Sequence, residues 1–350
     1  MRNIVFYLRY IIDCFITYRD IKKARALDVD LEPGWYFISR NSRCFLFHNN
    51  TPLSFLKMIG VDENKPKLYC YYQRKRKRCG FYDTQVIMTT NDGVRYFNYK
   101  EKTTLHCFNN YFEKELYQKA RSFLVPPFKC TTIQVKDSYC IERLIEHIPR
   151  RAWSYEEVLK RFFIIFDKYI EYLSKTHIFE HNIQDMLQAP KEINERYNQI
   201  MESLIHSIEV YKNTKFIFSH GDMHFENVLF ENNDFYVLDF ETAGNNIFYY
   251  DIFNLMYVEY IDKHNDYFIK AYLSKETMMM TYFERMFNVV NESFDYSLMH
   301  IYLKYFLLVR LSRSVSFLES KSDKIDYQNL VNNNVEKIKR VIDTISQYET

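Results

Sequence analysis

The sequence predicts an α+β protein built from two lobes, a small antiparallel β-sheet lobe with one helix and a larger lobe that is mostly α-helical. Runs rich in Val, Ile, Tyr and Phe, separated by polar turns, recur from about residue 35 to residue 144 and indicate strands. After Ser154 the apolar residues recur at helical spacing almost to the C-terminus, apart from one strand pair within residues 216–239. A chain of 350 residues is long enough for two separate cores.

The individual strands follow from apolar runs that end at turn residues. Asn91-Asp92-Gly93, for example, is a tight hairpin turn between two such runs. The predicted strands are WYFIS at 35–39, CFLF at 44–47, KLYCYYQ at 67–73, FYDTQVIMTT at 81–90, VRYFNYK at 94–100, and the segments 131–135 and 139–144.

The helices follow from periodicity and from capping residues. Ser154 and Glu157 form a capping box ahead of the first helix of the larger lobe. The smaller lobe is expected to hold one helix at residues 109–123, before a Pro-Pro breaker. The remaining predicted helices span residues 195–211, 252–272, 275–290, 297–318 and 327–348.

Composition excludes several classes of protein. The 47 basic and 45 acidic residues give a net charge of +2, so no nucleic-acid partner is expected. The 7 cysteines show neither a C-x-x-C pair nor a Cys/His cluster, which argues against a zinc site and a disulfide framework and favours the cytoplasm. No run of about 18 apolar residues occurs, so no transmembrane helix is predicted.

The stretch 216–251 carries the polar groups that indicate chemistry. An apolar run leads into the loop that holds Asp222, and Asn227 follows on the same loop. The predicted hairpin 228–238 then returns Asp239 beside Asn227. Mg²⁺ prefers oxygen ligands and takes few of them from protein, so these two side chains can hold it. Asp222 remains as a carboxylate that can orient a hydroxyl and accept its proton.

The motif H-G-D-x-H-x-x-N-x-L-F at residues 220–230, followed by L-D-F-E at 238–241, resembles the catalytic and metal-binding segments of the aminoglycoside phosphotransferase and choline kinase superfamily. That superfamily is a branch of the protein-kinase-like fold. The resemblance implies a bilobal enzyme that uses ATP or GTP with Mg²⁺, in which Asp222 is the catalytic base and Asn227 and Asp239 are the metal ligands.

The resemblance also implies residues that bind the nucleotide in the small lobe. A strand lysine that binds phosphates, held by a helix glutamate, matches best at Lys100 and Glu115. Lys102 and Glu113, two residues away, are the alternative pair. Residues 145–149 resemble the hinge between the lobes, where adenine would pair with backbone groups.

The turn Arg74–Gly80 stands where protein kinases have a Gly-rich loop over the phosphates. It holds one glycine and five consecutive cations, Arg74–Arg78. Three interpretations stay open: a solvated hairpin tip, a contact with nucleotide phosphates, and a contact with an anionic membrane surface.

Supporting roles follow from positions in the motif. His220 and His224 are expected to brace the catalytic loop, and Asp251 to support it from the start of a helix. Glu241 would lie near the acceptor and is the candidate substrate residue. A cationic acceptor would favour carboxylates and aromatic faces, and nearby candidates, each also consistent with ordinary core packing, are Tyr249, Tyr250, Tyr257, Tyr260 and Glu259.

The resemblance divides the chain into three parts. Residues 1–65 hold a helix and short strands of no assigned role, residues 66–148 the small nucleotide-binding lobe, and residues 149–350 the helical catalytic and substrate lobe. The apolar helix 4–15, flanked by basic residues, either packs in the core or lies in a membrane interface together with Arg74–Arg78.

The predicted function is therefore an ATP-dependent phosphotransferase that acts on a hydroxyl of a small molecule or glycan, such as a sugar, an amino alcohol or an aminoglycoside-like acceptor. Two alternatives remain. One is a kinase-fold binding module, or pseudokinase, without transfer activity, because the Gly-rich loop is missing. The other is a kinase of envelope glycans held peripherally at the cytoplasmic face of the membrane.

Overall fold

The structure is a computed structural model, and it separates into two compact units. The β unit contains Met1–Leu124, Lys129–Trp153 and Leu229–Glu241, and the helical unit contains Val125–Phe128, Ser154–Val228 and Thr242–Thr350. The described residues are 11–12, 15–16, 18–19, 21–22, 29–40, 44–61, 68–72, 81–90, 93–108, 114–115, 117–118, 126–182, 195–208, 213–231, 234–240, 242–319 and 327–349. A β-rich unit and a larger helical unit confirm the predicted α+β class.

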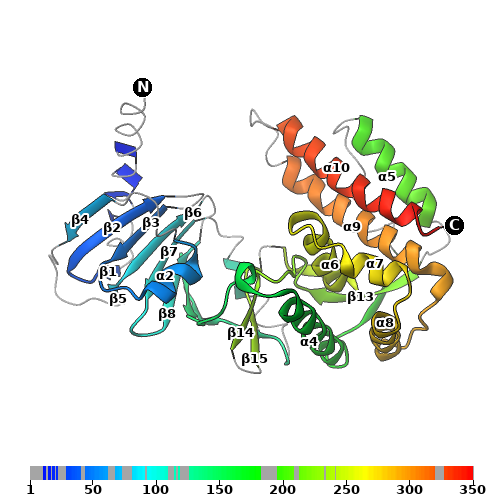
Figure 1. Cartoon of the computed structure of the whole chain (residues 1–350), viewed down its shortest axis with the longest axis horizontal. Coiled ribbons are helices and arrows are strands. Elements are labelled where there is room, and N and C mark those ends of the chain that lie inside the picture. The colour runs from blue at the N-terminus through cyan, green and yellow to red at the C-terminus, as the bar shows by residue number, and fades with distance from the viewer. Residues whose placement is uncertain are drawn as a thin grey trace. The chain divides into compact units, whose positions relative to one another are not determined.

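An eight-stranded antiparallel sheet forms most of the β unit, in the order β10-β11-β8-β7-β6-β3-β2-β4 (Figure 1). Its strands are β2 (Gly34–Arg40), β3 (Cys44–His48), β4 (Leu68–Tyr72), β6 (Val86–Thr90), β7 (Gly93–Asn98), β8 (Thr103–Cys107), β10 (Thr132–Val135) and β11 (Tyr139–Arg143). A separate short pair joins β1 (Val29–Leu31) to β5 (Phe81–Thr84) in parallel.

The pleat of this sheet separates two apolar cores. Tyr96 and Phe97 are neighbours on β7 and therefore point to opposite faces, and each belongs to a different buried cluster. On the Phe97 face, helix α2 (Leu53–Ile59) covers the sheet, and the ring of its Phe55 lies 5.7 Å from that of Phe97 in an edge-on arrangement. Both faces of the sheet at β7 thus carry buried apolar side chains.

The strands of this unit depart from the prediction at β7, β8 and β4. The predicted strand 94–100 ends earlier, because β7 stops at Asn98 and residues 99–102 form a turn in which the Asn98 side chain accepts a hydrogen bond from Glu101 N at 3.0 Å. The following residues form β8, a strand that carries no prediction, between β7 and β11. Strand β4 forms as predicted but pairs with β2 at the sheet edge instead of with the next strand in sequence.

The N-terminal helix is described only in part. Its described residues from Ile11 to Lys22 are helical; Ile16 and Ile21 pack against the Tyr96 cluster, whereas Phe15 is 72% exposed. The helix therefore has a packed side and an apolar side that this part of the structure leaves in solvent. Among the described helices of the chain, none has the length and apolar content needed to cross a bilayer.

The helical unit contains a three-stranded antiparallel sheet and most of the helices of the chain. The strands are β12 (Phe179–Asn182), β13 (Asn213–Ser219) and β16 (Gly244–Ile247), with β13 in the centre. The helices are α4 (Tyr155–Leu173), α5 (Glu195–Ile208), α6 (Tyr250–Asp262), α7 (Tyr267–Leu273), α8 (Thr277–Val289), α9 (Met299–Glu319) and α10 (Tyr327–Ser346).

Helix α4 begins where the sequence predicts it. The Ser154 hydroxyl accepts a hydrogen bond from Glu157 N at 3.2 Å, which satisfies one of the free N–H groups at the helix start. On the buried side of α4, Tyr169 and Tyr172 donate to the backbone carbonyls of Phe248 and Phe218 at 2.8 and 2.6 Å. The helix is thus bonded to the segments on both sides of the catalytic motif.

Helices α5, α9 and α10 lie side by side in the helical unit (Figure 1). Buried rings fill the space between its elements, and the rings of Tyr249 and Phe287 stack with centroids 5.8 Å apart. The tyrosine hydroxyls are also used, since Tyr197 of α5 donates to Leu311 O of α9 at 2.5 Å. The many aromatic residues of the sequence are therefore largely structural.

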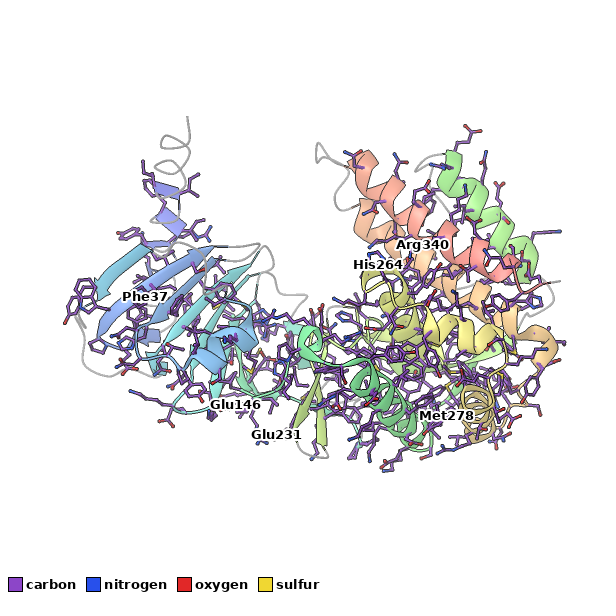
Figure 2. The ribbon with its side chains drawn as sticks, viewed as in Figure 1. Phe37, Glu146, Glu231, His264, Met278 and Arg340 are labelled. Carbon is purple, nitrogen blue, oxygen red and sulfur yellow. The ribbon has the colours of Figure 1, made fainter. Side chains whose placement is uncertain are left out.

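The predicted strand pair after the catalytic motif is present. Strand β14 (Val228–Glu231) lies beside β15 (Asp234–Val237), and β15 pairs in parallel with β9 (Lys129–Cys130). Arg143 holds this small sheet to the end of β11, because its guanidinium lies 2.8 Å from Glu231, which is labelled in Figure 2, and donates to the Tyr236 hydroxyl at 2.8 Å.

Candidate active site

The predicted catalytic loop, residues 220–227, begins at the end of strand β13. Phe216 and Ile217 on this strand are fully buried, so the strand is fixed in the core of the helical unit. The next residues turn away from the sheet, and Asn246 of β16 donates to the Ser219 hydroxyl at 2.8 Å. A rigid strand therefore positions the loop of residues 220–227.

Asp251 ties the loop to the first turn of helix α6. Its carboxylate accepts hydrogen bonds from His220 N at 2.9 Å and from Gly221 N at 2.8 Å, and Asp251 is almost fully buried. Burial raises the pKa of the Asp251 carboxyl, although the charge of His220 and the two backbone hydrogen bonds act in the opposite direction. The interaction fits the supporting role predicted for Asp251.

Gly221 allows the backbone to pass through a crowded point. Its φ of 78° lies in the left-handed region. A Cβ atom at this position would lie 2.3 Å from Thr242 O and 2.6 Å from the guanidinium of Arg313. That guanidinium also donates to Asn246 Oδ1 at 2.8 Å and to Thr242 O, so it cannot move without loss of hydrogen bonds.

Asp222 is half-buried and surrounded by donors within the helical unit. His224 Nε2 lies 3.6 Å from Oδ2 of Asp222, and Asn254 Nδ2 lies 3.3 Å from Oδ1. Burial raises the pKa of the Asp222 carboxyl, but the hydrogen bond and charge of His224, together with the charge of Arg310, hold it well below its usual value. Asp222 is therefore ionised across the physiological range of pH.

Asn227 closes the loop with its own side chain. Its Nδ2 donates to Asp222 O at 3.0 Å, and its backbone N–H donates to His224 O at 2.9 Å. Because the amide nitrogen bonds inside the loop, the amide oxygen is the atom that can bind a metal. Asn227 is buried, which suits a ligand that must keep one orientation.

Asp239 follows strand β15 and belongs to the β unit, whereas Asn227 belongs to the helical unit. Its φ of 64° is an uncommon backbone conformation for a residue with a side chain, and such residues often occur at functional sites. Asp239 is only partly buried. One carboxylate and one amide oxygen are the hard ligands that Mg²⁺ takes from proteins, so the residue types fit this ion.

The predicted nucleotide-binding pair is not brought together by the contacts that the structure describes. Lys100 lies in the turn after β7 and pairs with Glu32 at 2.6 Å, whereas Glu115 is exposed. The alternative lysine, Lys102, pairs with Glu146, which is labelled in Figure 2 and lies in the segment predicted to be the hinge. Glu113, Glu241 and the run Arg74–Arg78 lie outside the described residues.

The tyrosines considered for a cationic acceptor are core residues. Tyr249, Tyr250, Tyr257 and Tyr260 are all buried. Arginines of the chain itself already lie over three of these rings, with guanidinium carbons 5.2 Å from Tyr250, 4.4 Å from Tyr257 and 4.8 Å from Tyr260. The carboxylate named with these tyrosines, Glu259, is also buried and accepts a hydrogen bond from Asn265 at 3.1 Å.

Three residues around the loop carried no sequence prediction, namely Asn254, Arg310 and Arg313. Asn254 donates to Met223 O at 3.0 Å as well as facing Asp222, and Arg310 donates to the Asn254 side chain. Their spacing is a weak signal that they share helix faces. Asn254 lies three residues after Asp251 on α6, and the two arginines are three residues apart on α9. Nothing in the sequence indicates that the two helix faces meet.

Comparisons with known proteins agree with the motif. Residues 175–281, which include the motif, match the model of the phosphotransferase enzyme family, in agreement with the predicted superfamily over that segment. No protein of curated function matches the chain.

Several solved structures are similar over most of the chain. A choline/ethanolamine kinase family protein from Mesorhizobium loti has 11% identity over 75% of this chain and 89% of its own, with a TM-score of 0.45. The choline kinase LicA from Streptococcus pneumoniae has 12% identity over 74% and 91%, with a TM-score of 0.45. The macrolide 2'-phosphotransferase MphH from Brachybacterium faecium has 11% identity over 72% and 89%, with a TM-score of 0.42.

Gly221→Ala is expected to destabilise the protein by about 2 kcal/mol or more, because it adds both backbone strain and a clash with Thr242 O. Gly244→Ala is the matched control, since a Cβ there meets no atom within 4 Å. Urea unfolding of both variants measures the difference. Equal free energies of unfolding for the two variants would contradict this account of the loop.

Asp251→Ala is expected to lower the free energy of unfolding by about 2 to 5 kcal/mol, because two buried N–H groups lose their acceptor. Asp251→Asn keeps one acceptor oxygen and should cost less. Burial raises the folded-state pKa of Asp251, so its contribution falls as pH rises through that pKa. The stability of wild type relative to Asp251→Asn should therefore decrease above about pH 4; a rising difference would contradict the burial of this carboxyl.

Proposed function

From the match of residues 175–281 to the phosphotransferase enzyme family, we propose that this protein transfers the γ-phosphoryl group of ATP or GTP to a hydroxyl group of a small molecule or glycan. The observation that carries the proposal is the environment of Asp222. It stands on a loop fixed by Asp251, inside the matched segment, and its neighbours keep it ionised.

Asp222 would orient the acceptor hydroxyl and take its proton. One carboxylate oxygen faces Asn254 and the other faces His224, so the group is held in one orientation. A carboxylate with a lowered pKa is a weak base, and it accepts a proton only when the new bond to phosphorus is well advanced. Positioning of the hydroxyl is then the larger part of its role.

Asn227 and Asp239 would hold Mg²⁺ through oxygen atoms, and the ion would neutralise phosphate charge during transfer. Asn227 contributes an amide oxygen whose orientation is fixed by the hydrogen bond from Nδ2 to Asp222 O. The same hydrogen bond joins the metal ligand to the backbone of the residue that orients the hydroxyl. Glu241 stays the candidate for contact with the acceptor.

A membrane-associated variant of this function is favoured by one observation. Ile11, Ile12, Phe15 and Tyr18 of the N-terminal helix are large apolar residues with high exposure, and Lys22 on the same helix is also exposed. An exposed apolar surface beside basic residues can lie in the headgroup region of an anionic bilayer. The acceptor of such an enzyme would be a lipid-linked or envelope glycan.

Asp222→Ala is expected to lower the rate of phosphate transfer by about 100- to 10,000-fold, while nucleotide still raises the melting temperature. Asp239→Asn and Asn227→Ala are expected to reduce the Mg²⁺-dependent part of that thermal shift. The measurements are release of phosphate from ATP and GTP, with and without a panel of sugars, amino alcohols and aminoglycosides, and nucleotide-induced melting shifts.

Asp167→Asn, which changes a half-exposed carboxylate of α4, is the control and should retain wild-type activity. If wild type releases no phosphate from ATP or GTP, and neither nucleotide shifts its melting temperature, the proposed function is wrong. If Asp222→Ala and wild type release phosphate at the same background rate while nucleotide still binds, the chain is a binding module instead.

Flotation with anionic liposomes at low and high salt tests the membrane variant. Binding should be lost on Phe15→Ser with Tyr18→Ser and should weaken at high salt, because each basic side chain near the surface contributes about 1 kcal/mol. Met278→Ser removes an exposed apolar side chain of α8 (Figure 2) and should leave binding unchanged. A protein that stays off the liposomes at both salt concentrations excludes the membrane variant.

A further inference from the structure

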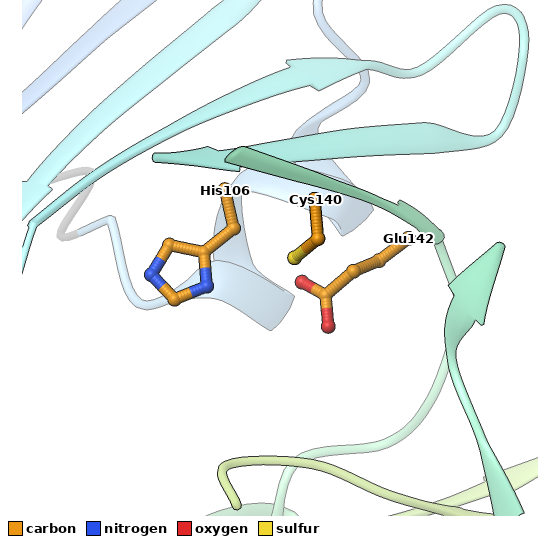
Figure 3. Close-up of side chains that lie close together, drawn as sticks. All are labelled: His106, Cys140 and Glu142. Carbon is orange, nitrogen blue, oxygen red and sulfur yellow. The ribbon is translucent and has the colours of Figure 1, made fainter. Parts of the chain in front are cut away.

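A polar cluster interrupts the apolar face of the main sheet in the β unit. Register pairs Arg95 of β7 with His106 of β8, and His106 with Cys140 of β11, so the three side chains leave the same face. Glu142, two residues after Cys140, also points to this face. Figure 3 shows His106, Cys140 and Glu142 gathered there.

The cluster has the residue types of a metal site, but its ligand atoms already have partners. One atom from each of His106, Cys140 and Glu142 lies within 4.8 Å of the others. Glu142 Oε1 accepts from the Thr131 hydroxyl at 3.0 Å, and His106 Nδ1 lies 3.2 Å from the Tyr117 hydroxyl. A metal ion would have to displace these contacts beside the positive charge of Arg95, so the cluster is better described as a hydrogen-bonded network.

Arg95 is the cation of this network and is held by a single carboxylate. Its Nη1 lies 2.9 Å from Glu142 Oε2, with 25% of the Arg95 side chain and 4% of the Glu142 side chain exposed. A guanidinium has five N–H donors, and the described residues supply one acceptor side chain for them, Glu142. The Arg95 guanidinium, in a side chain that is 25% exposed, therefore keeps N–H donors for which the described residues show no acceptor side chain.

The charge of Asp239 also acts on Arg95. Burial lowers the pKa of the Arg95 guanidinium, but the charges of Glu142 and Asp239 are among those that outweigh it and raise the pKa above its usual value. Arg95 thus stands in the field of the carboxylate to which the proposed function assigns the metal, and all three residues belong to the β unit. The ring of Phe240, next to Asp239, lies 6.0 Å from that of Tyr117 in the same network.

The two lysines considered for the nucleotide have a different environment. Lys100 and Lys102 lie in the turn between β7 and β8, with 61% and 44% of their side chains exposed. Each has its own carboxylate partner, Glu32 or Glu146. Neither lysine joins the network that contains Arg95.

We propose that Arg95, held by Glu142, is the cation of the β unit that binds the phosphates of the nucleotide. This inference rests on the proposed function, because it names a binding residue for the nucleotide of that reaction. A planar guanidinium can donate two parallel hydrogen bonds to a phosphate, and an ion pair that fixes its plane reduces the entropy lost on binding. Glu142 is accordingly a positioning residue, since it acts through Arg95.

Binding measurements with and without phosphate test the inference. Calorimetric titration of the full chain with Mg-ATP and with adenosine should show that Arg95→Gln weakens ATP binding by about 10- to 100-fold, while adenosine affinity is unchanged. Arg95→Lys should recover part of the loss. Glu142→Gln should raise KM for ATP more than it lowers kcat, because it misorients the guanidinium without removing it.

Arg95→Gln leaves Glu142 buried without its partner, so the double variant Arg95→Gln with Glu142→Gln is measured as well. It removes both charges and should show the same loss for ATP alone. Arg285→Gln is the control, because this arginine pairs with Asp167 on the surface of the helical unit and should bind ATP as wild type does.

The outcomes separate this inference from the proposed function. If wild type binds ATP and the double variant binds it equally well, or loses ATP and adenosine to the same extent, Arg95 does not contact phosphate and only the inference is wrong. The same holds if Lys100→Ala shows the ATP-specific loss and Arg95→Gln does not. If wild type binds no nucleotide, both proposals fall.

Discussion

The buried carboxylate of Asp251 accepts hydrogen bonds from two consecutive backbone N–H groups, and the position of the loop of residues 220–227 depends on this interaction. The loop leaves β13 through Gly221 in a left-handed conformation, which other residues adopt only at a cost. A carboxylate that satisfies both donors fixes that conformation. The hydrogen bonds and the nearby charge of His220 offset part of the cost of burying its charge.

Arginines with aromatic partners surround this loop. Arg310 lies over Tyr257 and donates to Asn254, which in turn faces Asp222. Arg313 lies over Tyr250 and donates to Gly221 O of the loop at 3.5 Å. A guanidinium can be buried in this way because the ring face and several acceptors replace water. The abundance of tyrosine therefore serves the electrostatics of the site as well as the core.

The β unit also holds a largely buried guanidinium that pairs with a side chain of another strand. Arg95 and Glu142 form an ion pair between strands. The Thr131 hydroxyl donates a hydrogen bond to the second oxygen of the Glu142 carboxylate. Strand β8 lies between the two strands that carry the pair and contributes His106 to the same face. Among its described residues, each unit thus holds a buried cluster of charged and polar side chains within a largely apolar core.

The sequence by itself determined the features that depend on neighbours along the chain. The capping box at Ser154, the helical periodicity beyond it, the loop of residues 220–227 and the following hairpin all result from short-range spacing, and all are present. The strand β8 was not predicted, because its residues follow a turn of charged residues and carry no alternating pattern that separates them from it.

Only the tertiary structure decided which distant side chains meet. Arg95 and Glu142 are 47 residues apart in sequence, and Asn254 and Arg310 are 56 apart. The contact between Arg95 and Glu142 depends on strand register, and a one-residue shift in register would abolish it. The contact between Asn254 and Arg310 depends on the packing of α6 against α9. The same reason explains Lys100, which has the right residue type near the expected position but lies in a turn and pairs with Glu32. Residue type is local information, whereas the direction of a side chain is set by the elements packed around it.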